Sequence, residues 1–388
     1  MKSPGAAIRL AHVCSSDLGI LPLLPFCEPL VARGWQITMI TPDGPNVARA
    51  LDAGMSWLPL LLQRRLHLAS DLRGAVQLGR YFREHRYDIV HTHNIKVGQI
   101  GRVVAAATRM PRIVHTVHGM AYSRDTPPVK RLLHAVLERI ASIGCDLVFT
   151  QSQEDRDMLL ASRAVREDRL VVIGNGIRLA RFDASAPAAR TQRAAVRAEL
   201  GLADDDVLFL SAGRLIREKG FPELFEATVR AHREDPRIRL AIAGPTDEQR
   251  ADALAPEVLE QARRDGILLL GRRDDMTALY AASDVVTLPS WHEGMPRVLM
   301  EGAAMGKPLL TTDVCGCREV VVPPRNGLIV PVRDAAALAT AMRSLAANEP
   351  LRAELGRANA IEARERFDIE RSVALVNSHY DRLLVEVA

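Results

Sequence analysis

The feature that most constrains the fold of this chain is an alternation of short apolar segments with longer segments of helical periodicity, such as residues 72–85 and 129–143. The short segments have the length and composition of β-strands. They are Ile8–Val13, Gln36–Ile40, Ser56–Leu60, Asp88–His91, Arg112–Val117, Asp146–Thr150, Leu170–Ile173, Val207–Ala212, Arg239–Ala243, Ile267–Leu270, Asp284–Leu288, Pro308–Thr311 and Leu328–Val330. Short apolar strands that alternate with helices predict parallel sheets covered by helices on both faces.

The alternation pauses near the middle of the chain. Asn175-Gly-Ile is followed by residues 184–197, which are rich in Ala, Arg and Pro. We therefore place a hinge near residues 175–190 and expect an α/β protein with two Rossmann-like domains, residues 1–180 and 181–366. In open α/β sheets, ligands bind beyond the carboxyl ends of the strands, so we expect both domains to face one ligand-binding crevice.

Bulk properties narrow the cellular context. A hydrophobic fraction of 48% with 25% charged residues is ordinary for a soluble globular chain. The five cysteines are scattered, and Cys315-Gly-Cys317 has no second cluster, which favours a reduced, cytoplasmic compartment over a zinc site. The N-terminus leads directly into a predicted strand, so we expect no signal peptide. No apolar run approaches the ~18 residues of a membrane span.

The charge is unevenly distributed. Residues 1–180 carry a net charge of +8, and the remainder carries −4. A basic first half favours an anionic partner, either a phosphorylated acceptor or an acidic membrane surface. An arginine-rich surface that is simply solvated is an equal alternative. We expect no nucleic-acid partner, because aromatic residues are only 4% of the chain and do not interleave with basic ones.

Two glutamates mark the strongest candidate site. Glu293 and Glu301 lie in Ser290-Trp-His-Glu-Gly-Met-Pro-Arg-Val-Leu-Met-Glu301, which follows a predicted strand and leads into a helix. Free backbone N–H groups and the helix dipole attract anions at such a junction. A carboxylate accepts hydrogen bonds from paired hydroxyls, as in a ribose or a hexose.

A second loop of the same half carries cations. Arg214 and Lys219 follow the strand Val207–Ala212, and a helix follows them. They could bind a diphosphate, Arg through its fork of donors and Lys as a point charge. The alternative is a solvent-exposed loop without a role, but the Glu293 loop is predicted at the same edge of the same sheet.

Histidines gather at predicted strand ends in the first half: His91, His93, His115 and His118, with Asn94 beside them. A metal site is one interpretation, although no Cys or carboxylate completes a familiar ligand set. The other interpretations are contact with a sugar or phosphate, proton handling, or a structural role. We favour sugar or phosphate contact for His118 and a structural role for His115, and we expect no metal.

One further acidic motif and several absent motifs bear on function. Asp155-Arg-Asp157 falls within a helical pattern, so we expect a surface helix rather than a metal–nucleotide motif. No Gly-x-Gly-x-x-Gly, Walker lysine loop or nucleophile elbow is present.

Taken together, these motifs resemble those of retaining GT-B glycosyltransferases of family 4, especially the bacterial surface-polysaccharide branch. The matching segments run in order over nearly the whole chain. They are Thr116-Val-His118-Gly119, Asn175-Gly-Ile with Phe182, Gly213-Arg-Leu with Lys219-Gly220, Glu293 to Glu301, Gly316-Cys-Arg-Glu-Val320 and Asn326-Gly327.

The resemblance implies roles for individual residues. Glu293 would contact the donor sugar and Glu301 the ribose, with Gly294, Met295 and Pro296 near the sugar or diphosphate. Arg214 and Lys219 would neutralise the departing diphosphate, and Gly19 would lie near the phosphates, although the family often has a Gly-Gly pair there. His118 and Glu293 would be the catalytic residues. His93, Asn94 and Lys96 would contact the acceptor, within acceptor loops at residues 64–72, 93–99 and 119–129. The C-terminal helix, residues 367–388, would pack on the first domain.

The resemblance also implies a reaction. A hexosyltransferase would move a sugar from a nucleotide sugar, UDP-linked by expectation, to a hydroxyl with retention of configuration and with no metal or other cofactor. We expect a lipid-diphosphate-linked saccharide as acceptor and peripheral contact with the cytoplasmic face of the inner membrane. A soluble acceptor, such as a secondary metabolite or thiol precursor, is the main alternative. A UDP-sugar 2-epimerase and a non-catalytic nucleotide-sugar binding protein remain open as rival functions.

Overall fold

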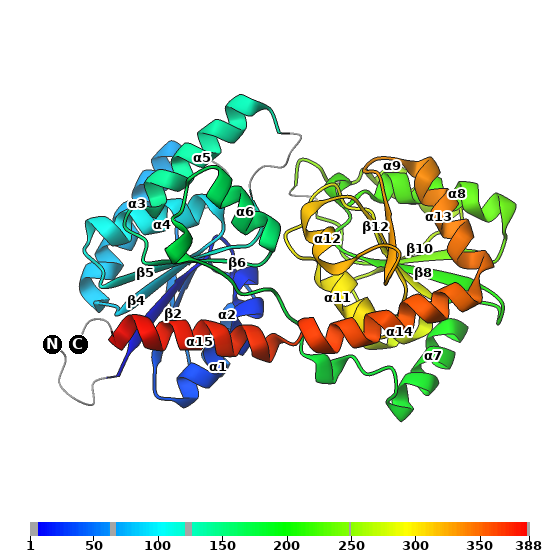
Figure 1. Cartoon of the computed structure of the whole chain (residues 1–388), viewed down its shortest axis with the longest axis horizontal. Coiled ribbons are helices and arrows are strands. Elements are labelled where there is room, and N and C mark those ends of the chain that lie inside the picture. The colour runs from blue at the N-terminus through cyan, green and yellow to red at the C-terminus, as the bar shows by residue number, and fades with distance from the viewer. Residues whose placement is uncertain (1–6, 63–66, 121–125, 248–249, 386–388) are drawn as a thin grey trace. The chain divides into compact units, whose positions relative to one another are not determined.

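The computed structural model of the chain describes residues 7–62, 67–120, 126–247 and 250–385 (Figure 1). The chain forms two compact units. Unit 1 consists of residues Met1–Asn175 and Glu370–Ala388, and unit 2 consists of Gly176–Ile369. The C-terminal residues therefore belong to the same unit as the N-terminal half.

Unit 1 is built on a seven-stranded sheet with the strand order β3-β2-β1-β4-β5-β6-β7. All neighbouring strands are parallel. The strands are β1 (Arg9–Val13), β2 (Gln36–Thr41), β3 (Ser56–Pro59), β4 (Ile89–His93), β5 (Arg112–Val117), β6 (Leu147–Thr150) and β7 (Leu170–Val172). In this register His12 lies beside His91, and His93 lies beside Thr116.

Helices cover both faces of this sheet, as Figure 1 shows. One face packs against α1 (Ile20–Ala32), α2 (Val47–Asp52) and α15 (Ile369–Val385). The other packs against α3 (Leu68–His85), α4 (Ile95–Ala107) and α6 (Gln153–Ala161). Helix α5 (Pro128–Ser142) lies against α4. The two buried apolar layers explain why the strands are apolar at successive positions rather than at alternate ones.

Unit 2 repeats the design with a six-stranded sheet in the order β10-β9-β8-β11-β12-β13. Its strands are β8 (Val207–Ala212), β9 (Ile238–Ala243), β10 (Leu268–Gly271), β11 (Val285–Leu288), β12 (Leu309–Thr312) and β13 (Gly327–Val330). Its helices are α7 (Pro187–Glu199), α8 (Phe221–Glu234), α9 (Pro256–Arg264), α10 (Met276–Ala282), α11 (Arg297–Ala304), α12 (Cys315–Val320), α13 (Ala335–Ala347) and α14 (Glu349–Arg366).

The predicted strands are all confirmed, with differences of at most two residues at either end. The C-terminal helix predicted at residues 367–388 is found as α15 in the described residues, and α13 and α14 precede it. Asn348 separates α13 from α14, and its side chain accepts a hydrogen bond from the backbone N–H of Leu351. Helix α15 adds Val376 and Tyr380 to the core of unit 1. Within the described residues, no helix is both long enough and apolar enough to cross a bilayer.

The expected surface helix at Asp155 is half right. Residues 155–157 do lie in α6, but Asp155 is buried. Its Oδ1 accepts a hydrogen bond from the backbone N–H of Met120 at 3.1 Å. Asp155 therefore anchors the segment that follows β5, which the helical pattern alone could not indicate.

Candidate functional site

Two loops of unit 2 meet at the carboxyl edge of its sheet. One follows β8 and carries Arg214 and Lys219, and the other follows β11 and carries Glu293. Because β8 and β11 are parallel neighbours, their carboxyl ends lie side by side. Lys219 Nζ donates a hydrogen bond to Glu293 Oε1 at 2.5 Å. The prediction that both loops lie at one edge of one sheet is confirmed.

Glycines allow these loops to approach so closely. Gly220 has φ +69°, and a Cβ placed on it would lie 2.0 Å from the carbonyl oxygen of Pro289. A Cβ on Gly316 would lie 2.1 Å from the carbonyl oxygen of Gly294. Larger residues at either position would push the Glu293 loop away from its neighbours.

The Glu293 carboxylate is held from two sides. Besides Lys219, the hydroxyl of Ser290 donates to Glu293 Oε1 at 2.6 Å. Side-chain exposure is only 11% for Glu293 and 22% for Lys219. A charged pair that is largely shielded from water interacts more strongly than a surface pair. Its two members are thus available to a ligand only if the ligand replaces part of this contact.

Glu301 has a separate set of partners on α10 and α11. The hydroxyl of Tyr280 donates to Glu301 Oε2 at 2.9 Å, and Arg297 Nε lies 3.6 Å from Glu301 Oε1. Burial raises the pKa of the Glu301 carboxyl, and the positive charge of Arg297 opposes this rise. Tyr280 is completely buried and fixes the direction of the carboxylate.

The other residues of unit 2 that were predicted for the site are Arg214, Gly294, Met295 and Pro296. Arg214 forms an ion pair with Asp247 at 2.9 Å and keeps 37% of its side chain exposed. Met295 packs against the core of unit 2. Pro296 immediately precedes α11, and Gly294 lies between Glu293 and this helix start. The cations and carboxylates of the edge are therefore mutually neutralised.

In unit 1, three histidines form a hydrogen-bonded chain. His93 Nδ1 lies 3.0 Å from His118 Nε2, and His12 Nδ1 lies 2.9 Å from His93 Nε2. The parallel pairing of β4 with β5 brings the histidines of these two strand ends together. Burial lowers the pKa of His118 to about 4, although a hydrogen bond with Gln151 opposes the shift. Burial likewise lowers the pKa of His12 to about 3 and that of His93 well below its ordinary value.

Because the three imidazoles are neutral, the hydrogen bonds that link them all run in one direction. A neutral imidazole has one N–H donor and one acceptor nitrogen. His12 Nε2 is buried and has no hydrogen-bond partner among the described residues. A buried donor without an acceptor is costly, so the favoured arrangement leaves His12 Nε2 without a proton. His12 then donates to His93, His93 donates to His118 Nε2, and the proton of His118 is on Nδ1.

The other two histidines of the cluster are held by structural contacts. His91 contacts the Tyr380 hydroxyl of α15 and lies 2.7 Å from Thr116 Oγ1. His115 Nδ1 lies 2.9 Å from the carbonyl oxygen of Thr92, in keeping with the structural role predicted for it. Ring nitrogens of His12, His91 and His93 lie within 4.8 Å of one another, which is close enough to suggest a metal site. Because most of these nitrogens are engaged in the hydrogen bonds above, we assign no metal there.

The predicted acceptor residues Asn94 and Lys96 lie at the end of β4 and the start of α4. Asn94 Oδ1 accepts hydrogen bonds from the backbone N–H of Ser15 at 3.0 Å and from its hydroxyl at 2.9 Å. Lys96 Nζ lies 2.6 Å from Asp71 Oδ1. Residues 64–66 and 121–125 of the predicted acceptor loops lie outside the described part of the chain.

Gly19 ends a 3₁₀ turn, Asp17–Gly19, beside the carboxyl end of β1. A Cβ at Gly19 would lie 3.0 Å from Cys14 Cβ, so a side chain there would crowd the strand end. The position thus favours a small residue even though the second glycine of the family pattern is absent.

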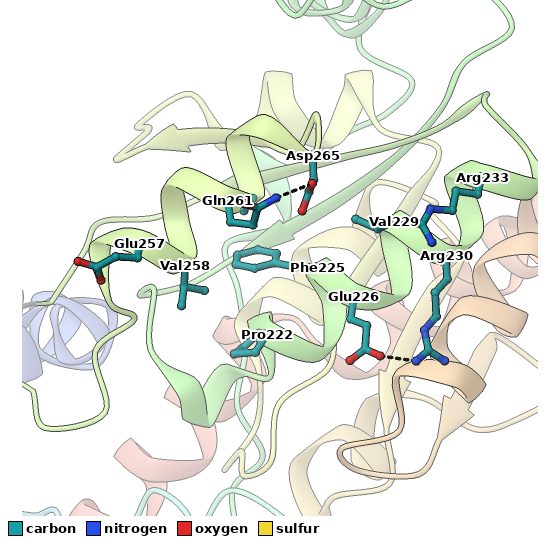
Figure 2. A pocket seen from close by; sticks show the side chains of 11 residues that line it. Pro222, Phe225, Glu226, Val229, Arg230, Arg233, Glu257, Val258, Gln261 and Asp265 are labelled. Carbon is teal, nitrogen blue, oxygen red and sulfur yellow. Dashed lines mark hydrogen bonds and ion pairs between the residues drawn. The ribbon is translucent and has the colours of Figure 1, made fainter.

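A hollow of about 610 Å³ lies elsewhere in unit 2, between α8 and α9 (Figure 2). Phe225 and Val258 line it, and so do Glu226 and Arg230, which form an ion pair. Its lining residues belong to the two helices and to Asp265, so this hollow is separate from the loops that carry Lys219 and Glu293.

Comparison with known proteins identifies the family. Residues 192–361 match the family described as glycosyl transferases group 1, and residues 23–176 match the glycosyl transferase 4-like domain. A D-inositol 3-phosphate glycosyltransferase of Xylanimonas cellulosilytica is 31% identical over 328 residues, which are 81% of this chain and 76% of that protein. The chain belongs to the group 1 glycosyltransferases.

A further relative and a solved structure are also similar to this glycosyltransferase. The UDP-Gal:alpha-D-GlcNAc-diphosphoundecaprenol alpha-1,3-galactosyltransferase of Escherichia coli is 29% identical over 342 residues, 86% of this chain and 87% of that protein. The crystal structure of Anabaena HepE in complex with UDP has a TM-score of 0.80 at 19% identity and covers 97% of this chain and 100% of its own. The predicted GT-B fold with two Rossmann-like domains is confirmed.

Several contacts of this glycosyltransferase were absent from the sequence prediction. His12, Tyr280 and Asp247 contact His93, Glu301 and Arg214, respectively. Only one signal was available for His12: it falls in a predicted strand of the half in which the other histidines gather. Tyr280 and Asp247 carry no motif and depend on the three-dimensional arrangement.

Proposed function

We propose that this glycosyltransferase transfers a hexose or N-acetylhexosamine from a UDP-linked donor to a hydroxyl of a lipid-diphosphate-linked saccharide. The observation that carries the proposal is the contact of Lys219 with Glu293 at the carboxyl edge of the unit 2 sheet. It places a cation suited to a diphosphate beside a carboxylate suited to sugar hydroxyls.

In this proposal, unit 2 binds the donor. Glu301, oriented by Tyr280, accepts hydrogen bonds from the ribose hydroxyls. Lys219 and Arg214 move from their carboxylate partners toward the diphosphate and stabilise the negative charge that develops when the sugar departs. Glu293 then contacts the hydroxyls of the sugar, with Gly294, Met295 and Pro296 lining the donor. We further propose that Gly19 contacts the phosphates.

The chemical step forms one bond and breaks another. The acceptor oxygen bonds to the anomeric carbon and passes its proton to the departing diphosphate, while the bond from that carbon to the diphosphate breaks and its electron pair leaves with the diphosphate. We propose that His118 contacts the sugar and that Asn94 and Lys96 contact the acceptor. His93, predicted as a third acceptor contact, is buried with both ring nitrogens hydrogen-bonded to His118 and His12, so we assign it to positioning His118 instead. We propose retention of configuration and no metal requirement, because two cations and the N-terminus of α11 can supply the charge stabilisation.

The relatives support this choice of substrates. One of them is named for a UDP-galactose donor and a diphosphoundecaprenol-linked acceptor. Two structural neighbours are complexes of Anabaena HepE, one with UDP and one with UDP-glucose. We therefore propose that the enzyme works at the cytoplasmic face of a membrane.

A soluble phosphorylated acceptor is a second candidate. The relatives named D-inositol 3-phosphate glycosyltransferases favour it, and so does the net charge of +8 in residues 1–180. Offering inositol 3-phosphate and a diphospholipid-linked N-acetylglucosamine in parallel separates the two.

The experiment is a thermal-shift screen of nucleotide sugars followed by mass spectrometry of the products formed with each acceptor. The proposal expects a UDP-sugar to stabilise the protein and the lipid-linked acceptor to gain one sugar. The anomeric configuration of the product and activity in the presence of EDTA then test retention and metal independence. Interconversion of the UDP-sugar without any acceptor would instead indicate an epimerase.

A further inference from the structure

Helix α5 of unit 1 exposes its apolar side chains, whereas an ordinary surface helix buries them. Seven apolar side chains of α5 and the residue just after it are 42–80% exposed. They are Val129, Leu132, Leu133, Val136, Leu137, Ile140 and Ile143. At 3.6 residues per turn, their spacing places them on one stripe with an arc of about 140°. A surface helix normally turns such a stripe toward the core.

The face of α5 that does pack on the protein is small and polar. Its buried residues are Glu138, Ala141 and Ser142. Glu138 Oε1 lies 2.6 Å from Arg102 of α4, whose side chain is completely buried, and Arg102 also donates to the Ser142 hydroxyl at 2.9 Å. This polar anchoring fixes the rotation of the helix. The apolar stripe is therefore directed outward by the structure and is not the result of a loosely attached helix.

The charges around the stripe are all of one sign. The exposed charged residues of α5, a helix described throughout, are Lys130, Arg131 and Arg139. On the helical wheel, Lys130 and Arg139 flank the stripe on its two sides. An apolar stripe bordered by cations is the pattern of a helix that lies in the interface of an anionic membrane.

A basic hollow continues this surface beyond the end of the helix. It has a volume of about 440 Å³ and is lined by four arginines among other residues. They are Arg139, Arg163, Arg166 and Arg169. Arg139 and Ile143 line the hollow and also belong to α5 or its immediate continuation, so the stripe and the hollow are contiguous. Arg166 pairs with Asp168 at 2.7 Å and Arg169 donates to the carbonyl oxygen of Cys145, so Arg139 and Arg163 are the arginines whose forks we assign to phosphate oxygens.

We propose that the α5 stripe, Lys130, Arg139 and the arginine hollow form a surface that binds an anionic lipid bilayer, with α5 lying in the interface plane. The stripe enters the acyl boundary, and the cations contact lipid phosphates. A second copy of the chain is a poorer occupant, because a symmetric contact between two stripes would bring cations of the same sign together. Figure 1 shows α5 as an outer helix of unit 1.

This inference gives a location to the membrane contact in the proposed function, but its test needs no activity. Full-length protein is sedimented with vesicles of phosphatidylglycerol and phosphatidylethanolamine, and with vesicles of phosphatidylcholine alone. We expect binding to the anionic vesicles and at least tenfold weaker binding to the neutral ones.

Variants then assign the surface. Leu132→Ser/Leu133→Ser should weaken binding to anionic vesicles about tenfold or more, since two exposed apolar anchors are lost. Leu51→Ser/Ile361→Ser is the matched control, because those side chains are 52% and 57% exposed on α2 and α14. This control should bind as the wild type does. Lys130→Glu/Arg139→Glu should reduce binding to anionic vesicles and leave the weak binding to neutral vesicles unchanged.

Three outcomes would overturn the inference. The stripe variant could bind anionic vesicles as well as the wild type does, or the wild type could fail to prefer them. Sedimentation equilibrium could also show that the wild type is a dimer and the stripe variant a monomer, which would make a second copy the occupant. Circular dichroism and UDP binding verify that each variant is folded. A protein that binds vesicles but transfers no sugar contradicts the proposed function alone, and an active protein that ignores vesicles contradicts this inference alone.

Discussion

His93 Nδ1 lies 3.0 Å from Nε2 of His118, and the opposite edge of the His93 ring contacts His12. The residue proposed to meet the sugar is thus one end of a buried chain of neutral imidazoles. Because His12 Nε2 has no partner among the described residues, the favoured direction of the chain leaves the His118 proton on Nδ1. His93 and His12 are therefore positioning residues for His118.

The first prediction concerns His93. His93→Ala should lower kcat by roughly tenfold to a hundredfold, because His118 loses the group that fixes its tautomer and orientation. UDP affinity should change little, since Glu301, Lys219 and Arg214, the main proposed UDP contacts, lie on unit 2. His93→Gln, which keeps an amide donor near His118, should recover part of the rate. Equal losses in kcat and UDP affinity would instead indicate a general structural defect.

The second prediction concerns acid stability. The pKa values of His12, His91, His93, His115 and His118 are all lowered by burial. Below about pH 6.5 the unfolded chain takes up protons that the folded chain does not, so stability falls as the pH falls. Each such histidine contributes a slope of about 1.4 kcal/mol per pH unit.

Denaturant unfolding between pH 7.5 and pH 5 measures this effect. His12→Gln should reduce this slope by about 1.4 kcal/mol per pH unit, because one buried neutral imidazole is removed. Stability that remains constant down to pH 5 would contradict the buried neutral cluster.

The third prediction concerns the buried hydroxyl that orients Glu301. Tyr280→Phe should weaken UDP binding by about 1 kcal/mol, which is roughly fivefold, because Glu301 loses a fixed hydrogen bond. Glu301→Ala should weaken binding further, by roughly 1–3 kcal/mol. Isothermal titration with UDP measures both. If Tyr280→Phe weakens binding while Glu301→Ala does not, Glu301 has no role in binding the nucleotide.

The fourth prediction follows from the Lys219–Glu293 pair. Lys219→Ala should weaken UDP binding several-fold, because a cation for the diphosphate is lost. Glu293→Ala should leave UDP binding unchanged or make it tighter, since Glu293 competes with the diphosphate for Lys219 Nζ. The same variant should lose most of its transfer activity. Isothermal titration with UDP measures the change in affinity for each single variant. Equal weakening in both would mean that the pair only supports the loop.

The strands, and the meeting of the two loops of the proposed donor site, were predictable from the sequence for definite reasons. Apolar runs such as Val207–Ala212 are buried on both faces and leave a strong local signal. Glu293 and Lys219 follow such strands, so placing the strands in one parallel sheet was enough to place the loops at one edge.

The partners within the site were not predictable in the same way. Whether His12 contacts His93 depends on the pairing of β1 with β4, which are separated in the chain by two other strands. Tyr280 reaches Glu301 through the packing of α10, and the burial of Asp155 depends on the path of the segment after β5. Local periodicity contains no information about such register and packing.

The most direct measurement of the central claim is sugar transfer by Glu293→Ala/Glu301→Ala, followed by mass spectrometry of the acceptor that the wild type uses. If these carboxylates hold the donor, the double variant should be folded. Its transfer rate should fall about thirtyfold or more, as expected for two lost polar contacts. Transfer at the wild-type rate would contradict the assignment of this edge of unit 2 as the donor site.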